Sequence, residues 1–267
     1  MVTSATRWTV MMVLASLASA CTNQTGPAVS IPAARAPEQI AAARPAASQG
    51  HLPTGMTVRS VGAKAYVVET FSASPPGSAL HVVTSLAGKA KAGDAEAAYA
   101  IYLKIRDCSE QALMRPAAAP DSNCEGLDVD DGAAAYQWLE LAAHRGSLQA
   151  RLLYASDPEI VLGDAADMLR DPERILQYKT QAMRYLNEAA QGGSVDALLA
   201  LADLYRGGTV VNRDLPMSYA YLQAAARADP ALVPQVRMDE LALEIGPQER
   251  ARALQASGRI YEQCCVD

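Results

Sequence analysis

Hydrophobic residues recur at helical spacing along most of the chain after residue 77. Ser78 follows a Pro-Pro-Gly stretch and is a candidate N-cap, because its hydroxyl can accept a hydrogen bond from the first turn of a helix. Leu80, Val83 and Leu86 then share one face of the predicted helix. The pattern therefore predicts an amphipathic helix at the start of a helical region.

The clearest pair of helices is predicted within residues 193–226. The hydrophobic face of the first helix consists of Ala197, Leu201, Ala202, Leu204 and Tyr205. Gly207 and Gly208 end this helix, since glycine readily adopts left-handed conformations, and Asp214 is the expected N-cap of the second helix. The face of the second helix consists of Tyr221, Leu222, Ala225 and Ala226. Neither helix can bury its face alone, so the pair needs neighbours to stack on.

The turn that leads into this pair recurs along the chain. Alanines precede each of Gly93, Gly146 and Gly193, and Asp229 occupies the same place in a degenerate fourth copy. The interval from Gly193 to Asp229 is the shortest, and the two earlier intervals contain insertions rich in Pro, Asp and Gly. These insertions are residues 116–132 and 157–172. The spacing predicts three helix-turn-helix units, two of them lengthened between their helices.

The unit that begins at Gly193 has the run Gly-x-x-x-Ala-x-x-x-Leu-x-x-x-Tyr-x-x-Gly and ends in Tyr-Leu-x-x-Ala-Ala. This pattern resembles the Sel1-like repeat, a relative of the tetratricopeptide repeat with a period of about 36 residues. The resemblance covers residues 85–230 and is interrupted at Asp157 and Pro158, which shorten the first helix of the second unit. It implies an all-α fold, a right-handed α-solenoid of Sel1-like repeats at residues 78–230.

Beyond Asp229 the repeat pattern fades. Residues 231–244 and 247–263 predict two further helices, separated by the stop and start signals Gly246 and Pro247. Terminal units of solenoids are atypical because one of their faces meets water. We therefore expect residues 231–267 to form C-terminal capping helices.

Residues 1–20 have the organisation of a bacterial signal peptide. Their apolar run, residues 8–17, is shorter than the roughly 20 residues that span a bilayer. The residues before Cys21 resemble a lipobox, which implies that Cys21 carries a lipid; Ala18 stands where the family prefers leucine. An ordinary signal-peptidase site that leaves Cys21 unmodified is the alternative. Thr22 is not the aspartate that retains such lipoproteins in the inner membrane, so an outer-membrane anchor is favoured.

Two segments separate this leader from the repeats. Residues 21–55 are rich in Ala and Pro and lack apolar periodicity, which predicts a disordered tether. Residues 56–77 are expected to form an irregular extension. Within this extension, residues 65–71 fit either a short strand or one helical turn.

Composition narrows the possible functions. The formal net charge is -6 and the pI is about 5.2, which argues against a nucleic-acid partner, since phosphate binding needs a concentrated basic surface. Hydrophobic residues make up 50% of the chain but aromatic residues only 5%, which favours closely packed helices over β-sandwiches.

Four cysteines lie beyond Cys21. Export would place them in an oxidising compartment, so a Cys108–Cys124 disulfide that closes the first insertion is expected, with free thiols as the alternative. The pairing of the adjacent Cys264 and Cys265 stays open. They could bond to each other, to another chain, or to one of the first pair.

No catalytic, cofactor or metal-binding pattern is present in the sequence. The histidines His51, His81 and His144 are far apart, and no nucleophile motif or phosphate-binding loop occurs. Polar residues do recur at one position of the first helix in each unit. These residues, Glu96, Gln149 and Asp196, are the expected contacts of any ligand in the groove, with water as the default occupant.

These observations predict a non-catalytic adaptor or scaffold that binds envelope proteins on the periplasmic side of the cell envelope. Its membrane contact would be the N-terminal lipid. One alternative is a scaffold for polysaccharide export, a role of some Sel1-like lipoproteins. Another is penicillin binding or weak β-lactamase activity, which is linked to exported Sel1-like proteins with a disulfide in nearly every repeat. This chain has too few cysteines for that pattern.

Overall fold

The computed structural model describes residues 55–114, 122–125, 127 and 129–266. The expected signal peptide, the lipidation site Cys21 and nearly all of the expected tether lie outside these residues. Among the described residues, no helix combines the length and the apolar character needed to cross a bilayer.

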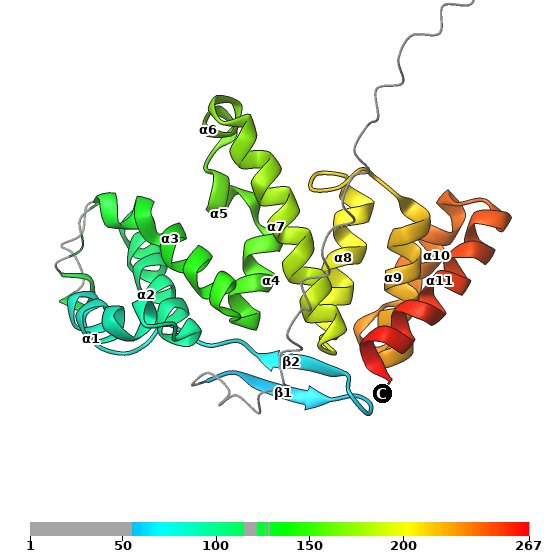
Figure 1. The fold of residues 1–267 in the computed structure, drawn as a ribbon, viewed down its shortest axis with the longest axis horizontal. Coiled ribbons are helices and arrows are strands. Elements are labelled where there is room, and N and C mark those ends of the chain that lie inside the picture. Colours follow the sequence, from blue (N-terminus) through cyan, green and yellow to red (C-terminus); the bar gives the residue numbers. More distant parts are fainter. Residues whose placement is uncertain (1–54, 115–121, 126, 128, 267) are drawn as a thin grey trace, which may run out of the picture. The chain divides into compact units, whose positions relative to one another are not determined.

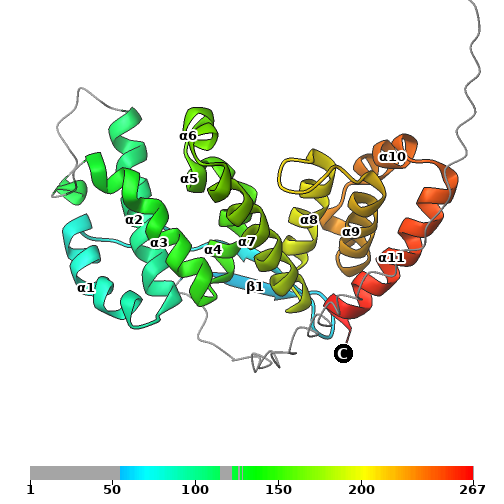
Figure 2. The same ribbon diagram turned by 45° about the horizontal axis from the view of Figure 1, so that its top comes forward.

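The described chain is a series of helices that pack on their neighbours in sequence (Figures 1 and 2). The helices of the three units are α1 (Ala79–Lys91), α2 (Ala95–Met114), α3 (Val129–Arg145), α4 (Leu148–Ser156), α7 (Pro172–Gln191), α8 (Val195–Gly207) and α9 (Leu215–Ala228). Each of them contacts the next along the chain, which is the arrangement of a helical-repeat solenoid. The predicted helical fold class is confirmed.

The same turn joins successive units. Gly93, Gly146 and Gly193 all have positive φ, which glycine adopts without a steric penalty. The next residue in each case accepts a hydrogen bond from the backbone N–H three positions later. These capping pairs are Asp94 with Ala97, Ser147 with Ala150, and Ser194 with Ala197. The recurring sequence motif is therefore a combined glycine turn and helix N-cap.

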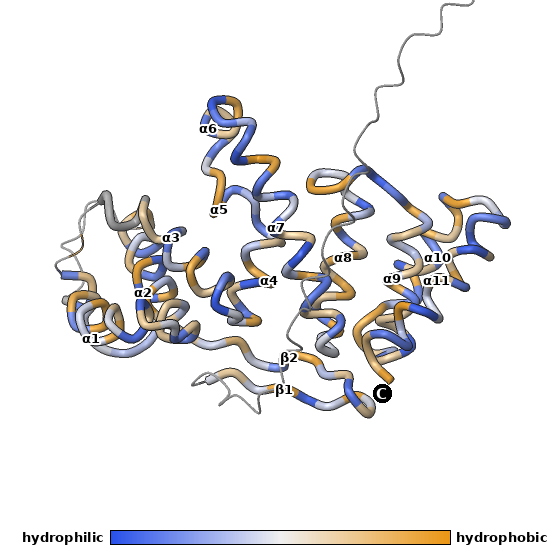
Figure 3. The backbone as a smooth tube through the Cα atoms, viewed as in Figure 1, coloured by the Kyte–Doolittle hydropathy of each residue, from blue (hydrophilic) through white to orange (hydrophobic). Residues whose placement is uncertain are grey.

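The core is built from small and large side chains in alternation. Alanines are fully buried where helices cross, which lets the helix axes approach closely, and leucines and tyrosines fill the remaining space. Buried alanines include Ala142, Ala150, Ala182, Ala202 and Ala225, and buried large residues include Tyr102, Leu139, Tyr185, Leu186, Leu198, Leu201 and Leu222. Figure 3 shows the corresponding interleaving of hydrophobic and hydrophilic residues along the helices.

The local signals predicted for the helix ends are confirmed. Ser78 caps α1, and Asp214 caps α9 by accepting from the backbone N–H of Met217 at 2.9 Å. Gly208 ends α8 with a left-handed φ of 75°. Beyond α9, the 3-10 helix η2 (Pro230–Leu232) leads into α10 (Gln235–Glu244) and α11 (Pro247–Cys265), and both α-helices pack on α9.

The second insertion is more ordered than the sequence indicated. Asp157 and Pro158 end α4 after nine residues, as expected, but the residues that follow form α5 (Pro158–Leu162) and α6 (Ala165–Arg170). In the first insertion, the 3-10 helix η1 (Ser122–Cys124) carries Cys124, which is bonded to Cys108 of α2. Closing a loop of this length stabilises a fold by about 3 kcal/mol in the entropic model. Cys264 and Cys265 are bonded to each other.

The N-terminal extension is not irregular, which corrects the expectation for residues 56–77. Strands β1 (Thr57–Ser60) and β2 (Tyr66–Thr70) form an antiparallel hairpin, so the strand alternative for residues 65–71 is the right one. Val67 and Val68 are buried, and the backbone N–H of Val61 closes the turn on the carbonyl of Ala65. We refer to residues 57–72 as the strap.

Candidate functional site

The strap lies across the N-terminal ends of α4 and α8 (Figure 1). The backbone N–H of Val68 donates to Oδ2 of Asp196 at 2.9 Å. The N–H of Ser72 donates to Oε1 of Gln149 at 2.6 Å, and Nε2 of Gln149 donates back to the Ser72 hydroxyl at 2.9 Å. Two of the three predicted groove positions, Gln149 and Asp196, therefore make hydrogen bonds to a segment of the chain itself.

The turn at Gly193 brings the strap into direct backbone contact with the solenoid. The N–H of Tyr66 donates to the carbonyl of Gly193 at 2.9 Å. A Cβ at Gly193 would overlap the carbonyl oxygen of Lys64, whereas nothing lies within 4 Å of the equivalent position at Gly146. The strap therefore needs glycine at this one junction for close approach as well as for the turn.

Ionic contacts fix the other end of the strap. Arg59 contacts Glu69 at 3.0 Å and Asp229 at 2.6 Å, and the ammonium of Lys64 donates to the carbonyl of Gln263 at 3.3 Å. The hydrogen bond from Arg59 lowers the pKa of the Asp229 carboxyl. Burial has the opposite effect on Asp196 and raises the pKa of its carboxyl. The strap thus connects residues of α4, α8 and the C-terminal helices.

Glu96, the third predicted groove position, makes no hydrogen bond to the strap in the described part of the chain. Burial raises the pKa of its carboxyl, and a hydrogen bond with Ser147 opposes that shift. Its Oε2 atom is buried without a hydrogen-bond partner among the described residues. Glu96 therefore belongs to the contact between the first two units.

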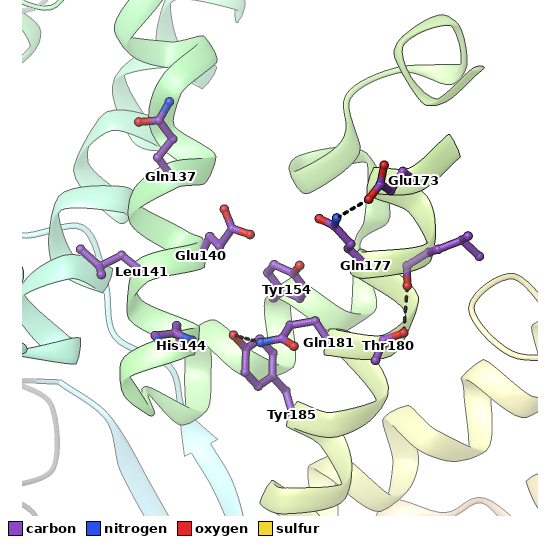
Figure 4. A pocket seen from close by; sticks show the side chains of 11 residues that line it. Gln137, Glu140, Leu141, His144, Tyr154, Glu173, Gln177, Thr180, Gln181 and Tyr185 are labelled. Carbon is purple, nitrogen blue, oxygen red and sulfur yellow. Dashed lines mark hydrogen bonds between the residues drawn. The ribbon is translucent and has the colours of Figure 1, made fainter. Parts of the chain in front are cut away.

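A cavity of about 870 Å³ opens between α3 and α7, on residues that the sequence analysis did not single out (Figure 4). It exists because α4 is short and leaves the space above its last turn unfilled. The lining residues are Gln137, Glu140, Leu141 and His144 from α3, Tyr154 from α4, and Glu173, Leu176, Gln177, Thr180, Gln181 and Tyr185 from α7. The helix break at Asp157 was the only sequence signal for this space.

The chemistry of this cavity is acidic and rich in hydrogen-bond acceptors. Neither Glu140 nor Glu173 forms an ion pair within the part of the chain that the structure describes, and no lysine or arginine lines the space. Tyr154 is 2% exposed, yet its hydroxyl makes no hydrogen bond to any described residue. Burial, with a contribution from Glu140, raises the pKa of Tyr154.

Aromatic packing holds Tyr154 in place. Its ring centroid lies 5.3 Å from that of Tyr178 and 5.4 Å from that of Tyr185. A smaller cavity of about 400 Å³ shares Glu140, Tyr154, Glu173 and Gln177 with the first and continues towards α5. Its one basic residue is already engaged, because Arg174 lies over the ring of Tyr136 and donates to the carbonyl of Val161 at 2.6 Å.

Among the described residues, no three metal-binding side chains of the His, Cys, Asp or Glu type converge. His144 lies on the cavity wall, exposed and at the C-terminal end of α3. The geometry therefore defines one internally occupied set of polar residues and one open polar cavity.

The fold and these two features define the class of the protein, an α-helical repeat protein with a β-hairpin strap. No family model matches the chain, and no curated protein matches it. Among solved structures it is similar to a protective antigen of uropathogenic Escherichia coli that displays an SLR fold. The two are 16% identical with a TM-score of 0.34, and the match covers 68% of this chain and 41% of the antigen. The match thus spans about two-fifths of that protein's length.

Proposed function

We propose that this chain is a Sel1-like repeat scaffold that binds protein partners on the periplasmic side of the bacterial cell envelope. The observation that carries this proposal is the open cavity between α3 and α7, in which two carboxylates form no ion pair and a tyrosine hydroxyl makes no hydrogen bond within the described chain. A concave surface whose polar groups lack such partners is suited to a ligand that supplies hydrogen-bond donors and positive charge. At two of the three recurring polar positions, Gln149 and Asp196, the described chain supplies the hydrogen-bond donors itself.

The proposed location rests on the sequence that precedes the described residues. The apolar run and the small residues before Cys21 favour export and lipidation, and the Pro-rich segment that follows would let the repeat body stand off a membrane. The non-catalytic role is an inference from fold and architecture, which by themselves do not define a function. Each part of the proposal therefore has its own test.

Partner binding is tested by photo-cross-linking in intact cells. A photoreactive amino acid would replace Leu176, which lies on the cavity wall and is 66% exposed, and in a separate variant Leu243 of α10, which is 88% exposed and distant in sequence. We expect a discrete protein adduct from position 176 and none from position 243. Identical adduct patterns, or none at either position, would contradict the proposal.

Lipid attachment is tested by labelling cells with radioactive palmitate. The wild-type chain should incorporate the label and fractionate with the outer membrane, and Cys21→Ser should do neither. Incorporation that survives Cys21→Ser would exclude this anchor. Turnover of nitrocefin by the purified chain, above that of a heat-inactivated control, would contradict the non-catalytic role.

A further inference from the structure

The cavity between α3 and α7 has the size of a ligand pocket and rigid walls. Its volume of about 870 Å³ lies in the range of ligand pockets, roughly 300–1,000 Å³. Its walls are two helices of adjacent units and its floor is Tyr154, whose ring is fixed by Tyr178 and Tyr185. A ligand there would not have to order the protein, and pre-organisation of this kind lowers the entropic cost of binding.

The charges of the walls define what the site attracts. Several acidic residues on other parts of the surface have basic neighbours; for example, Glu188 contacts Arg151 at 3.1 Å, and Glu244 contacts Arg213 at 3.0 Å. Glu140 and Glu173 have none among the described residues, although they face the same concave space from opposite helices. Two uncompensated carboxylates in one cavity favour a cation as the ligand.

A second and independent observation is the unpaired hydroxyl of Tyr154. Figure 4 shows this side chain directed into the space between the two helices, with Glu140 on one side and Gln177 on the other. The side chain is 2% exposed and its hydroxyl lacks a hydrogen-bond partner in the described chain. A hydroxyl that faces the cavity from an otherwise buried side chain is free to exchange hydrogen bonds with a ligand atom placed there.

The remaining wall residues include further acceptors. Gln177 donates its amide to Glu173 at 3.4 Å and Gln181 donates to the hydroxyl of Tyr185 at 2.9 Å, which leaves the carbonyl oxygens of both carboxamides as acceptors. A ligand that complements this surface is rich in donors. The lysine ammonium has three N–H donors and the arginine guanidinium has five.

The apolar wall residues complement the part of such a ligand that lies next to its charged group. Leu141 and Leu176 line the cavity from α3 and α7 and can cover the aliphatic part of a long basic side chain. The strap provides a precedent within the molecule for the peptide that carries such a side chain. There, the carboxamide oxygen of Gln149 accepts from the backbone N–H of Ser72, and its nitrogen donates to the Ser72 hydroxyl.

We propose that this cavity binds an extended segment of a partner protein by inserting one of the partner's lysine or arginine side chains between Glu140, Glu173 and Tyr154. The inference deepens the proposed scaffold function and rests on it. The ammonium or guanidinium donates to the two carboxylates and to the tyrosine oxygen. The partner's backbone lies along the carboxamides of Gln137 and Gln177 on opposite walls.

The test uses the purified full chain and a set of short labelled peptides that differ only in their central residue, which is Lys, Arg, Gln or Glu. Binding is measured by fluorescence anisotropy at low ionic strength. The Lys and Arg peptides should bind at least about tenfold more tightly than the Gln peptide, as expected for a hydrogen bond to a charged group. The Glu peptide should show no binding.

Two double variants locate the site. Glu140→Gln/Glu173→Gln removes the charges of the cavity, and Glu240→Gln/Glu262→Gln removes the same charge from exposed positions of α10 and α11. The first should abolish the preference for Lys and Arg, and the second should leave it intact. Tyr154→Phe, which keeps the ring, should weaken binding of the Lys peptide severalfold without changing its preference over the Gln peptide.

Three results would overturn the inference. The first is equal binding of the Lys and Gln peptides, or no binding of either. The second is the same loss in both double variants, which would mean long-range attraction without a site. The third is complete displacement of the Lys peptide by a free polyamine at equal concentration, which would assign the site to a small cation. A partner that cross-links at position 176 equally in Glu140→Gln/Glu173→Gln would refute this inference alone and leave the scaffold function standing.

Discussion

The polar residues beneath the strap and those of the open cavity differ in one respect that matters for function. Gln149 and Asp196 accept hydrogen bonds from the strap, and Gln149 is 1% exposed as a result. Glu140 and Tyr154 line the open cavity and receive no donor from the described chain. The first group stabilises the fold, whereas the polar groups of the second remain free to contact a ligand.

The difference follows from what covers each surface. An extended strand presents backbone N–H groups at regular intervals, and each must find an acceptor when the strand is buried. Gln149 and Asp196 are the acceptors that the strap finds at α4 and α8. No strand lies over the cavity between α3 and α7 in the described chain, so its acceptors remain available.

The largest expected effect is that of Gly193→Ala. Alanine at this positive φ should cost about 1–3 kcal/mol in strain, and its overlap with the carbonyl of Lys64 should cost about 1–3 kcal/mol more. Gly146→Ala is the matched control, since it has a similar φ but open space around the added carbon. Chemical denaturation should show the larger loss in Gly193→Ala; equal losses would mean that the strap is not held at this turn.

Gln149→Ala should have the next largest effect, about 2–4 kcal/mol, because it removes two hydrogen bonds to Ser72 and leaves the backbone N–H of Ser72 unpaired. Its control is Gln137→Ala in the open cavity, which should change the unfolding free energy by less than about 0.5 kcal/mol. Hydrogen exchange at Ser72 should also accelerate in Gln149→Ala. A larger loss in Gln137→Ala would reverse the comparison.

For Asp229→Asn, a smaller effect on the unfolding free energy is expected, and it should be seen at acidic pH. The pKa of Asp229 is lowered in the folded state from its usual value of 3.8 by Arg59. The carboxylate therefore contributes stability above pH 3.8 that is lost as the pH falls through the lower folded pKa. Unfolding free energies measured from pH 6 downwards should fall less steeply in Asp229→Asn than in the wild type. Parallel curves would show that this ion pair does not hold the strap.

Asp196→Asn should change the pH dependence of the unfolding free energy in the direction opposite to Asp229→Asn. Its effect on the unfolding free energy at neutral pH should be small. Burial raises the pKa of Asp196, so the stability linked to its protonation is fully present below pH 3.8 and is lost as the pH rises through the folded pKa. Asparagine keeps an acceptor for the N–H of Val68 and carries no charge at any pH. At pH 7 the variant should be as stable as the wild type or slightly more stable, and Asp196→Ala should be less stable than both.

The smallest expected effect on folding is that of Glu140→Gln/Glu173→Gln, whose side chains have no ion pair to lose in the described chain. Thermal unfolding should show a change within about 0.5 kcal/mol. A marked loss of stability would mean that these carboxylates serve the fold, and it would remove the distinction between the covered and the open surface.

Repetition made part of this architecture predictable. The glycine turns, the caps at Ser78 and Asp214 and the break at Asp157 all depend on neighbouring residues, so local sequence was sufficient to find them. Recurrence at one repeat position also selected Gln149 and Asp196 as contact residues. Their occupant was not predictable, since Ser72 and Val68 reach them from 77 and 128 positions away.

The sequence by itself determined the helical repeat, because helix periodicity and turn chemistry act over a few residues and recur in every unit. Only the tertiary structure decided which polar groups are satisfied. The strap meets α8 through contacts that no local pattern encodes, and the cavity at Tyr154 results from α4 ending early between two longer helices. Both depend on how separate units stack, and stacking brings together residues whose chemistry is not evident until they are neighbours.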